Sequence, residues 1–140
     1  MYINRFQKYK QQDYRFKKGD VVYVDLGAGK SSEQGGIRPC VIVQNDIGNK
    51  YSPTTIVAPI SSQIKYNRNG NLQPTHFVIE NYQEAGLKSR SMILCEQLRV
   101  ISKERILDRF PKGHIDFEAF RNQIMIALGL NDNQELFNIQ

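Results

Sequence analysis

Short runs of β-branched and other apolar residues, each bounded by Gly, Pro, Asn or Ser, dominate the middle of this sequence. Runs of this length and composition predict β-strands. The expected strands cover residues 21–26, 38–44, 55–60, 76–80 and 91–101. Turn signals separate these short runs, and a single helical pattern follows them at the end of the chain. The pattern therefore favours a small β-barrel or a curled sheet over a βαβ fold.

The end of the chain carries the clearest helical pattern. Apolar residues between positions 115 and 128 recur with the spacing of one helix face, with Asp116 near the start and Gly129 as the stop. A shorter helix is expected over residues 103–107, with Ser102 as its cap. With 140 residues, the chain is expected to form a single domain.

Two connecting segments are expected to be irregular. Residues 27–36 hold four glycines and two serines, which is too flexible a composition for a strand or a helix. The dipeptide Asn69-Gly70 is typical of a tight β-hairpin, which we expect to lead into the strand at residues 76–80.

Positive charge is concentrated at the start of the chain. Residues 1–20 contain six Lys or Arg against two Asp, so they carry +4 of the net charge of +5. We expect residues 1–16 to be a basic arm outside the core, residues 17–130 to be the folded domain, and residues 131–140 to be a tail. The charge is compatible with a polyanionic partner.

Several classes of protein are disfavoured. The apolar runs fall far short of the roughly 20 residues of a membrane-spanning helix, and the N-terminus lacks the pattern of a secretory signal. Cys40 and Cys95 lie in apolar runs and are expected to be core thiols in a reducing cytoplasm. His76 and His114 lack metal-ligand spacing; they could form an acid–base couple, but ordinary strand and turn positions are favoured. We expect neither a metal nor a cofactor.

The segment SSEQGGIRP, residues 31–39, places an arginine directly after a glycine-rich loop. Pro39 favours extended backbone at Arg38, which fixes the direction in which its side chain leaves the strand. A guanidinium offers a planar fork of donors that matches phosphate oxygens. The pattern fits a phosphate site, but taken alone it favours a salt bridge at the edge of a strand.

Polar residues gather at the ends of the expected strands, in residues 44–46, 52–55 and 61–63. They could hydrogen-bond bases and phosphates, or they could simply form turns. Glu96 and Gln97 interrupt the apolar run at residues 91–101. Because neighbouring residues of a strand point to opposite faces, at least one of the two is expected to face the interior or a groove.

Six segments taken together resemble the MazF/PemK/Kid family. They are KKGDVVYVDL, SSEQGGIRP, CVIVQND, IGNKYSPTTIVAPIS, PTHFVIE and SMILCEQLRVI, and they follow the order and spacing of that family over residues 17–130. The resemblance implies an SH3-like (MazF/Kid/CcdB-like) barrel with a C-terminal helix, mainly β with some α. It also implies a homodimer with an RNA groove and a cognate antitoxin whose tail occupies that groove.

The resemblance further implies which residues act. The catalytic arginine of the family falls on Arg38 and its catalytic hydroxyl on Ser61. Serine here replaces the threonine of the family, so the hydroxyl is held less rigidly. The segment at residues 66–71 is longer than in many relatives. The expected RNA contacts are Ser32, Glu33, Gln34, Asn45, Glu96 and Gln97.

The activity implied is that of a toxin of a toxin–antitoxin pair, a metal-independent endoribonuclease that cuts single-stranded mRNA in a sequence-specific manner. A ribose 2′-OH attacks the adjacent phosphorus and leaves a 2′,3′-cyclic phosphate and a 5′-OH. Arg38 would stabilise the charge of the transition state, and Glu33 is one conceivable base. Two alternatives stay open on the same barrel: a non-enzymatic gyrase poison and an RNA-binding module without catalysis.

Overall fold

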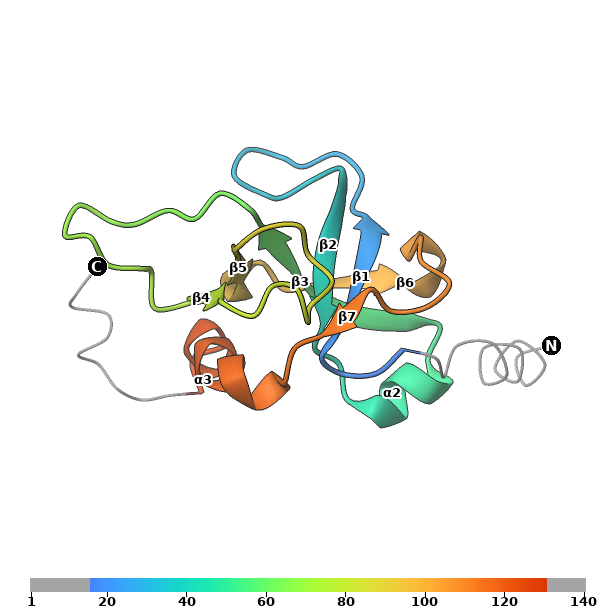
Figure 1. Cartoon of the computed structure of the whole chain (residues 1–140). Helices are drawn as coiled ribbons and strands as arrows, with labels where there is room; N and C mark the ends of the chain where they lie inside the picture. The colour runs from blue at the N-terminus through green and yellow to red at the C-terminus, as the bar shows by residue number, and fades with distance from the viewer. Residues whose placement is uncertain (1–15, 131–140) are drawn as a thin grey trace.

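The glycine-rich loop joins the first two strands of an antiparallel sheet. In the computed structural model, which describes residues 16–130, these strands are β1 (Asp20–Asp25) and β2 (Ile37–Ile42), and their pairing runs from Val21 opposite Val41 to Asp25 opposite Ile37 (Figure 1). Both lie within two residues of the predicted bounds. Residues 1–15 of the expected arm and the tail at 131–140 lie outside the described residues. The last residue assigned to the arm, Phe16, was placed wrongly, because its ring is buried in the core.

The longest strand, β3 (Thr54–Ser61), organises the rest of the sheet. Its N-terminal half pairs with β6 (Arg99–Ser102) and its last two residues pair with β5 (Ser91–Leu94), while its middle pairs with β2. The edge strands are β4 (His76–Ile79), beside β5, and β7 (Gly113–His114), beside β1. The order is therefore β4-β5-β3-β2-β1-β7. β6 lies outside this order and pairs with β3 as well.

One half of the sheet curls nearly into a closed barrel. Beyond β6, an isolated bridge pairs Ile106 with Val24 of β1, and Leu107 N–H donates to the Tyr23 carbonyl oxygen at 2.9 Å. The barrel interior is filled by apolar side chains that alternate along the strands. These are Phe16, Val22, Val24, Leu26, Cys40, Ile42, Val57 and Ile101. The predicted small barrel is confirmed.

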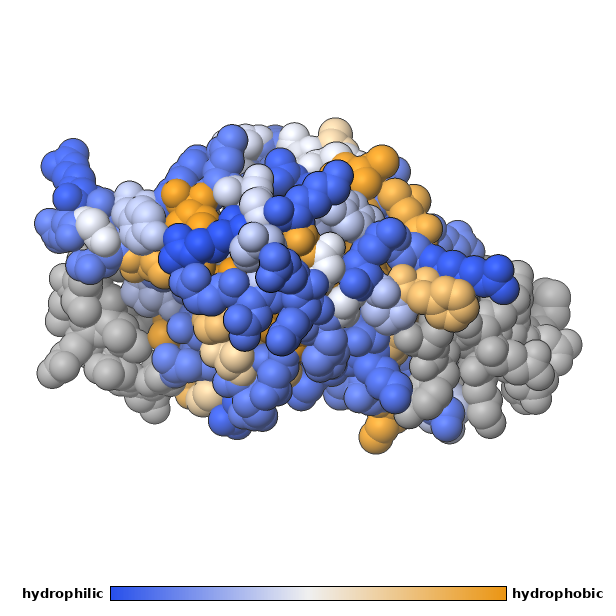
Figure 2. Space-filling view, in the orientation of Figure 1, coloured by the Kyte–Doolittle hydropathy of each residue, from blue (hydrophilic) through white to orange (hydrophobic). Residues whose placement is uncertain are grey.

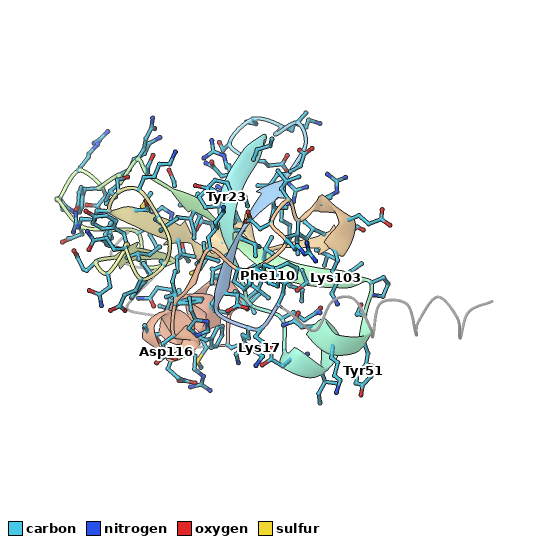
Figure 3. The ribbon with its side chains drawn as sticks, turned by 45° about the vertical axis from the view of Figure 1, so that its right-hand side comes forward. Lys17, Tyr23, Tyr51, Lys103, Phe110 and Asp116 are labelled. Carbon is cyan, nitrogen blue, oxygen red and sulfur yellow. The ribbon has the colours of Figure 1, made fainter. Side chains whose placement is uncertain are left out.

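Helix α3 (Phe117–Ala127) covers the other face of the sheet, as predicted (Figure 1). Asp116, labelled at the helix start in Figure 3, accepts a hydrogen bond from Glu118 N–H at 3.1 Å. Gly129 takes a left-handed φ of 71° just after the helix. The fully buried ring of Phe120 packs against neighbouring aromatic rings, at 6.1 Å from Phe77 and 5.1 Å from Phe117. Among residues 16–130, no helix is long and apolar enough to cross a membrane.

The prediction of one strand over residues 91–101 is wrong. A 3-10 turn, η1 (Cys95–Gln97), separates β5 from β6. The turn carries Glu96 out of the sheet, where its carboxylate meets Thr75 and His76 instead of entering the core. The helix expected after it is a single 3-10 turn, η2 (Lys103–Arg105), with Ser102 as the predicted cap.

The sequence around Asn69-Gly70 forms a turn, but the expected hairpin is wrong. β4 pairs with β5, which follows it, and residues 62–75 between β3 and β4 contain no strand. A second helix, α2 (Asp46–Tyr51), was not predicted. Buried Asn49 attaches this helix to the rest of the fold. Its side-chain Oδ1 accepts a hydrogen bond from Thr55 Oγ1 at 2.8 Å, and its backbone carbonyl oxygen accepts one from the buried Lys103 amine.

Candidate functional site

A groove lies on one face of the sheet, where β2 begins and β3 ends. Cys40 pairs with Pro59, and the same register extended by two residues brings Arg38 beside Ser61 on the same face. The face continues through the pairs of Ser61 with Met92 and of Leu94 with His76. The groove has a volume of about 380 Å³. Its lining residues are Ser32, Gln34, Arg38, Ser61, Ser62, Gln63, Lys65, His76, Met92, Leu94, Glu96 and Gln97.

Arg38 is a half-buried cation in this groove. Its Nε donates to the Gly35 carbonyl oxygen at 2.9 Å, so the loop before the strand holds the guanidinium by its inner nitrogen. Gly36, with a φ of 72°, makes the turn that carries the backbone from this loop into β2. Within residues 16–130 no carboxylate forms an ion pair with Arg38. Its outer nitrogens are therefore free to bind an anion in the groove.

Gln97 ties the glycine-rich loop down beside the groove. Its Oε1 accepts a hydrogen bond from Gln34 N–H at 2.9 Å, and its Nε2 donates to the Ser32 carbonyl oxygen at 3.3 Å. Both ends of the amide are engaged, so Gln97 positions the loop. The side-chain Oε1 of Gln34 is buried with no hydrogen-bond partner among the described residues, which leaves an acceptor at the wall of the groove.

Glu96 is held in place by two side chains that reach it from around the start of β4. Thr75 Oγ1 donates to Glu96 Oε1 at 3.0 Å, and His76 Nε2 lies 3.1 Å from Glu96 Oε2. Burial alone would raise the pKa of the Glu96 carboxyl. The hydrogen bonds from His76, from its own backbone and from Thr75 outweigh that effect and leave the pKa below its ordinary value. Glu96 is thus an ionised acceptor at the groove.

We expect the stabilising effect of this carboxylate to depend on pH. Because its pKa is lowered by folding, ionised Glu96 stabilises the protein above the ordinary value of 4.5, and the contribution is lost as the pH falls through the lowered pKa. Melting temperatures of wild type and Glu96→Gln should therefore differ at pH 6 and converge towards pH 3. Glu104→Gln, at an exposed carboxylate outside the groove, is the control. A difference between wild type and Glu96→Gln that is constant over this range would contradict the assignment.

The structure brings together most, but not all, of the predicted site residues. Ser61 lies in the groove, but it is buried and its hydroxyl exchanges hydrogen bonds with the backbone of Gln63, at 3.2 and 3.4 Å. Glu33 lies outside the groove: its Oε1 accepts from Lys30 N–H at 3.1 Å. Asn45 is also outside, because it is the N-cap of α2 and accepts from Gly48 N–H at 2.8 Å.

Sequence reasoning missed several groove residues. His76 was interpreted as an ordinary strand histidine, yet its ring lines the groove and its Nδ1 is buried without a hydrogen-bond partner among residues 16–130. Lys65 was also missed, whereas Ser62 and Gln63 belong to the polar segment 61–63, for which the sequence left binding and turn formation open. The period-two alternation that places Ser61 on this face also places His76 there, so the strand registers were the signal that could have found it.

The two cysteines are buried and free, as expected of core thiols. Burial raises the pKa of each thiol to about 12, so neither is a ready nucleophile. In the part of the chain that the structure describes, no three His, Cys, Asp or Glu side chains lie close enough together to hold a metal ion. The chemistry that the groove offers is hydrogen bonding and charge, from Arg38, His76 and Glu96.

Comparison with known proteins places this groove in a wider context. Residues 17–125 match the family described as PemK-like, MazF-like toxin of type II toxin-antitoxin system. The sequence is 45% identical over 119 residues to endoribonuclease EndoA of Bacillus subtilis (strain 168), covering 83% of this chain and 97% of that protein. The fold resembles MazF from Deinococcus radiodurans, with a TM-score of 0.63 and 18% identity over 81% of this chain and 96% of that one. It also resembles an endoribonuclease solved with its cognate antitoxin from a mycobacterial species, with a TM-score of 0.62 and 17% identity over 83% and 97% of the two chains.

Proposed function

Because this chain belongs to the PemK-like, MazF-like toxin family of type II toxin–antitoxin systems, we propose that the groove around Arg38 cuts single-stranded RNA. The chain is an endoribonuclease toxin, in line with its 45% identity to EndoA over nearly the whole of that enzyme. The proposal concerns what the groove does: it binds the scissile phosphate and promotes attack by the neighbouring ribose 2′-OH.

The observation that carries this mechanism is the Arg38 guanidinium in the groove, which forms no ion pair with a carboxylate of residues 16–130. When the 2′-oxygen attacks phosphorus it loses its proton, and negative charge grows on the non-bridging oxygens. The P–O5′ bond then breaks and the 5′-oxygen takes up a proton, so that no proton is gained or lost overall. Arg38 is held by Gly35 through Nε, so its outer N–H groups can donate to those oxygens. It remains protonated in proteins, so it acts as a donor and not as a base. Ser61 would have to break its bonds to Gln63 before its hydroxyl could help.

Base recognition falls to the polar groups beside this phosphate site. An ionised Glu96 accepts hydrogen bonds from base amino or imino groups, and the side chain of Gln34 lines the groove with it. Reading these base edges requires bases that are not paired, which favours single-stranded RNA over a duplex. Thr75 positions Glu96, and Gln97 positions Gln34.

The partners follow from the same proposal. We propose that a cognate antitoxin inhibits the toxin, as the name of the family implies, that the toxin forms a homodimer and that it acts in the cytoplasm on mRNA. The complex of the mycobacterial relative with its antitoxin supports an inhibitory partner. The 45% identity to an endoribonuclease favours RNA cleavage over the gyrase-poison alternative.

Purified protein tests the proposal directly. We expect it to cut a single-stranded RNA in EDTA at one or a few sequences, and to leave DNA of the same sequence intact because DNA has no 2′-OH. Gel analysis of both strands, with a fully paired RNA duplex as a second control, checks this. Intact single-stranded RNA, or equal cutting of the DNA, would contradict the proposed function.

A further inference from the structure

The long connection between β3 and β4 brings cations to the end of the groove. Residues 62–75 contain Lys65 and Arg68 and no Asp or Glu. Lys65 lines the groove together with Arg38, and Arg68 is exposed further along the loop. No carboxylate among residues 16–130 forms an ion pair with either of them. In the view of Figure 1 this loop projects at the upper left, and Figure 2 shows a mostly hydrophilic surface there.

The tip of the loop holds its own shape. The Asn67 side chain accepts hydrogen bonds from Asn69 N–H at 2.9 Å and from Asn71 N–H at 3.0 Å. The backbone closes the same turn, since Asn67 N–H donates to the Asn71 carbonyl oxygen at 2.7 Å. Gly70 supplies the left-handed φ of 79° that the turn requires. Arg68 is therefore presented from an ordered turn.

The start of the loop lies beside the connection between β4 and β5. Arg90 donates from Nε and Nη2 to the two carboxylate oxygens of Glu80, at 2.9 and 2.8 Å. The Arg90 guanidinium also interacts electrostatically with the side chain of Tyr66, directly after Lys65. The hydrogen bonds from Arg90 keep the pKa of Glu80 below its ordinary value, so the pair stays charged at neutral pH. The ion pair of Arg90 with Glu80 thus lies beside the start of the loop, next to Tyr66.

We propose that residues 62–75 form a second contact site for the RNA, in which Lys65 binds a phosphate at the end of the groove and Arg68 binds a phosphate of a nucleotide beyond it. The inference rests on the proposed function, since the ligand is the same single strand. A strand carries one phosphate per nucleotide, so RNA that leaves the groove past Lys65 must place further phosphates beside this loop. Lys65 and Arg68, which form no ion pair with a carboxylate of residues 16–130, match that row of charge.

Binding of short and long RNA separates this site from the groove. Two strands with the sequence that the wild type cuts, about 5 and about 12 nucleotides long, carry 2′-deoxy sugars so that they are bound and not cut. For the longer strand, Lys65→Ala/Arg68→Ala should weaken binding about tenfold and lower the slope of log K against log salt by about 1.4, at about 0.7 per phosphate on single strands. Fluorescence anisotropy over a salt series measures both.

The matched control is Lys112→Ala/Arg121→Ala, which removes the same charge at exposed positions outside the groove and the loop. It should keep the wild-type slope, and thermal unfolding checks that both variants fold. The inference is overturned if the loop variant binds the longer strand as tightly as the control does, or if it loses affinity equally for both strands. A loop that serves a protein partner would give that same result. The proposed function is tested separately, because it depends on whether the wild type cuts RNA.

Discussion

Replacing Arg38 by alanine should lower the rate of RNA cleavage by about a hundred- to a thousandfold. A donor aimed at the developing oxyanion typically contributes about 3–4 kcal/mol to transition-state stabilisation. Since Arg38 is half-buried and forms one hydrogen bond, to Gly35, the fold should survive its loss. Single-turnover cleavage of a defined RNA measures the rate, and circular dichroism measures the fold.

Two further variants sharpen this test. Arg38→Lys keeps the charge but loses the planar fork of donors, so it should restore only part of the rate. Arg121→Ala removes an exposed arginine of α3 outside the groove and should cleave as the wild type does. A folded Arg38→Ala protein that cleaves at the wild-type rate would exclude Arg38 from the mechanism.

The largest expected effect on stability comes from Phe120→Ala. The ring is fully buried between the sheet and α3, in contact with Phe77 and Phe117. Its removal should cost about 3–5 kcal/mol of the free energy of unfolding, through lost burial and the cavity left behind. For a domain of this size, the melting temperature should fall by about 10–20 °C.

A matched control lies at the C-terminal end of the same helix. The side chain of Leu128 is 56% exposed, so Leu128→Ala should change the free energy of unfolding by no more than about 0.5 kcal/mol. Urea unfolding of the three proteins measures the differences. Equal stability of Phe120→Ala and wild type would mean that α3 does not pack on the sheet as described.

Local sequence patterns were sufficient for the elements that bury one regular face. The β-branched runs predicted β1 and β3 to within one residue at each end, and the apolar face of α3, with Asp116 and Gly129, predicted its limits. Each of these patterns repeats over several residues and ends at a residue that cannot continue it.

The parts that were missed depend on contacts across the fold. Whether Glu96 continues a strand or turns out of it is decided by Thr75 and His76, some twenty positions earlier in the chain. A polar side chain after a strand can contact a ligand or cap a helix, and the sequence does not distinguish the two. Asn45 was predicted to bind RNA, but in the structure it caps α2. The resemblance to a family indicated Arg38 and Ser61, but their closeness depends on the register of β2 against β3.

The ends left at the cut test most directly whether this groove promotes attack by the ribose 2′-OH. Mass spectrometry of a defined RNA cut in EDTA should find a 2′,3′-cyclic phosphate on the upstream fragment and a 5′-OH on the downstream fragment. A single 2′-deoxy sugar at the nucleotide directly before the cut should prevent cleavage. A 3′-OH with a 5′-phosphate, or cleavage of the 2′-deoxy strand, would contradict the mechanism.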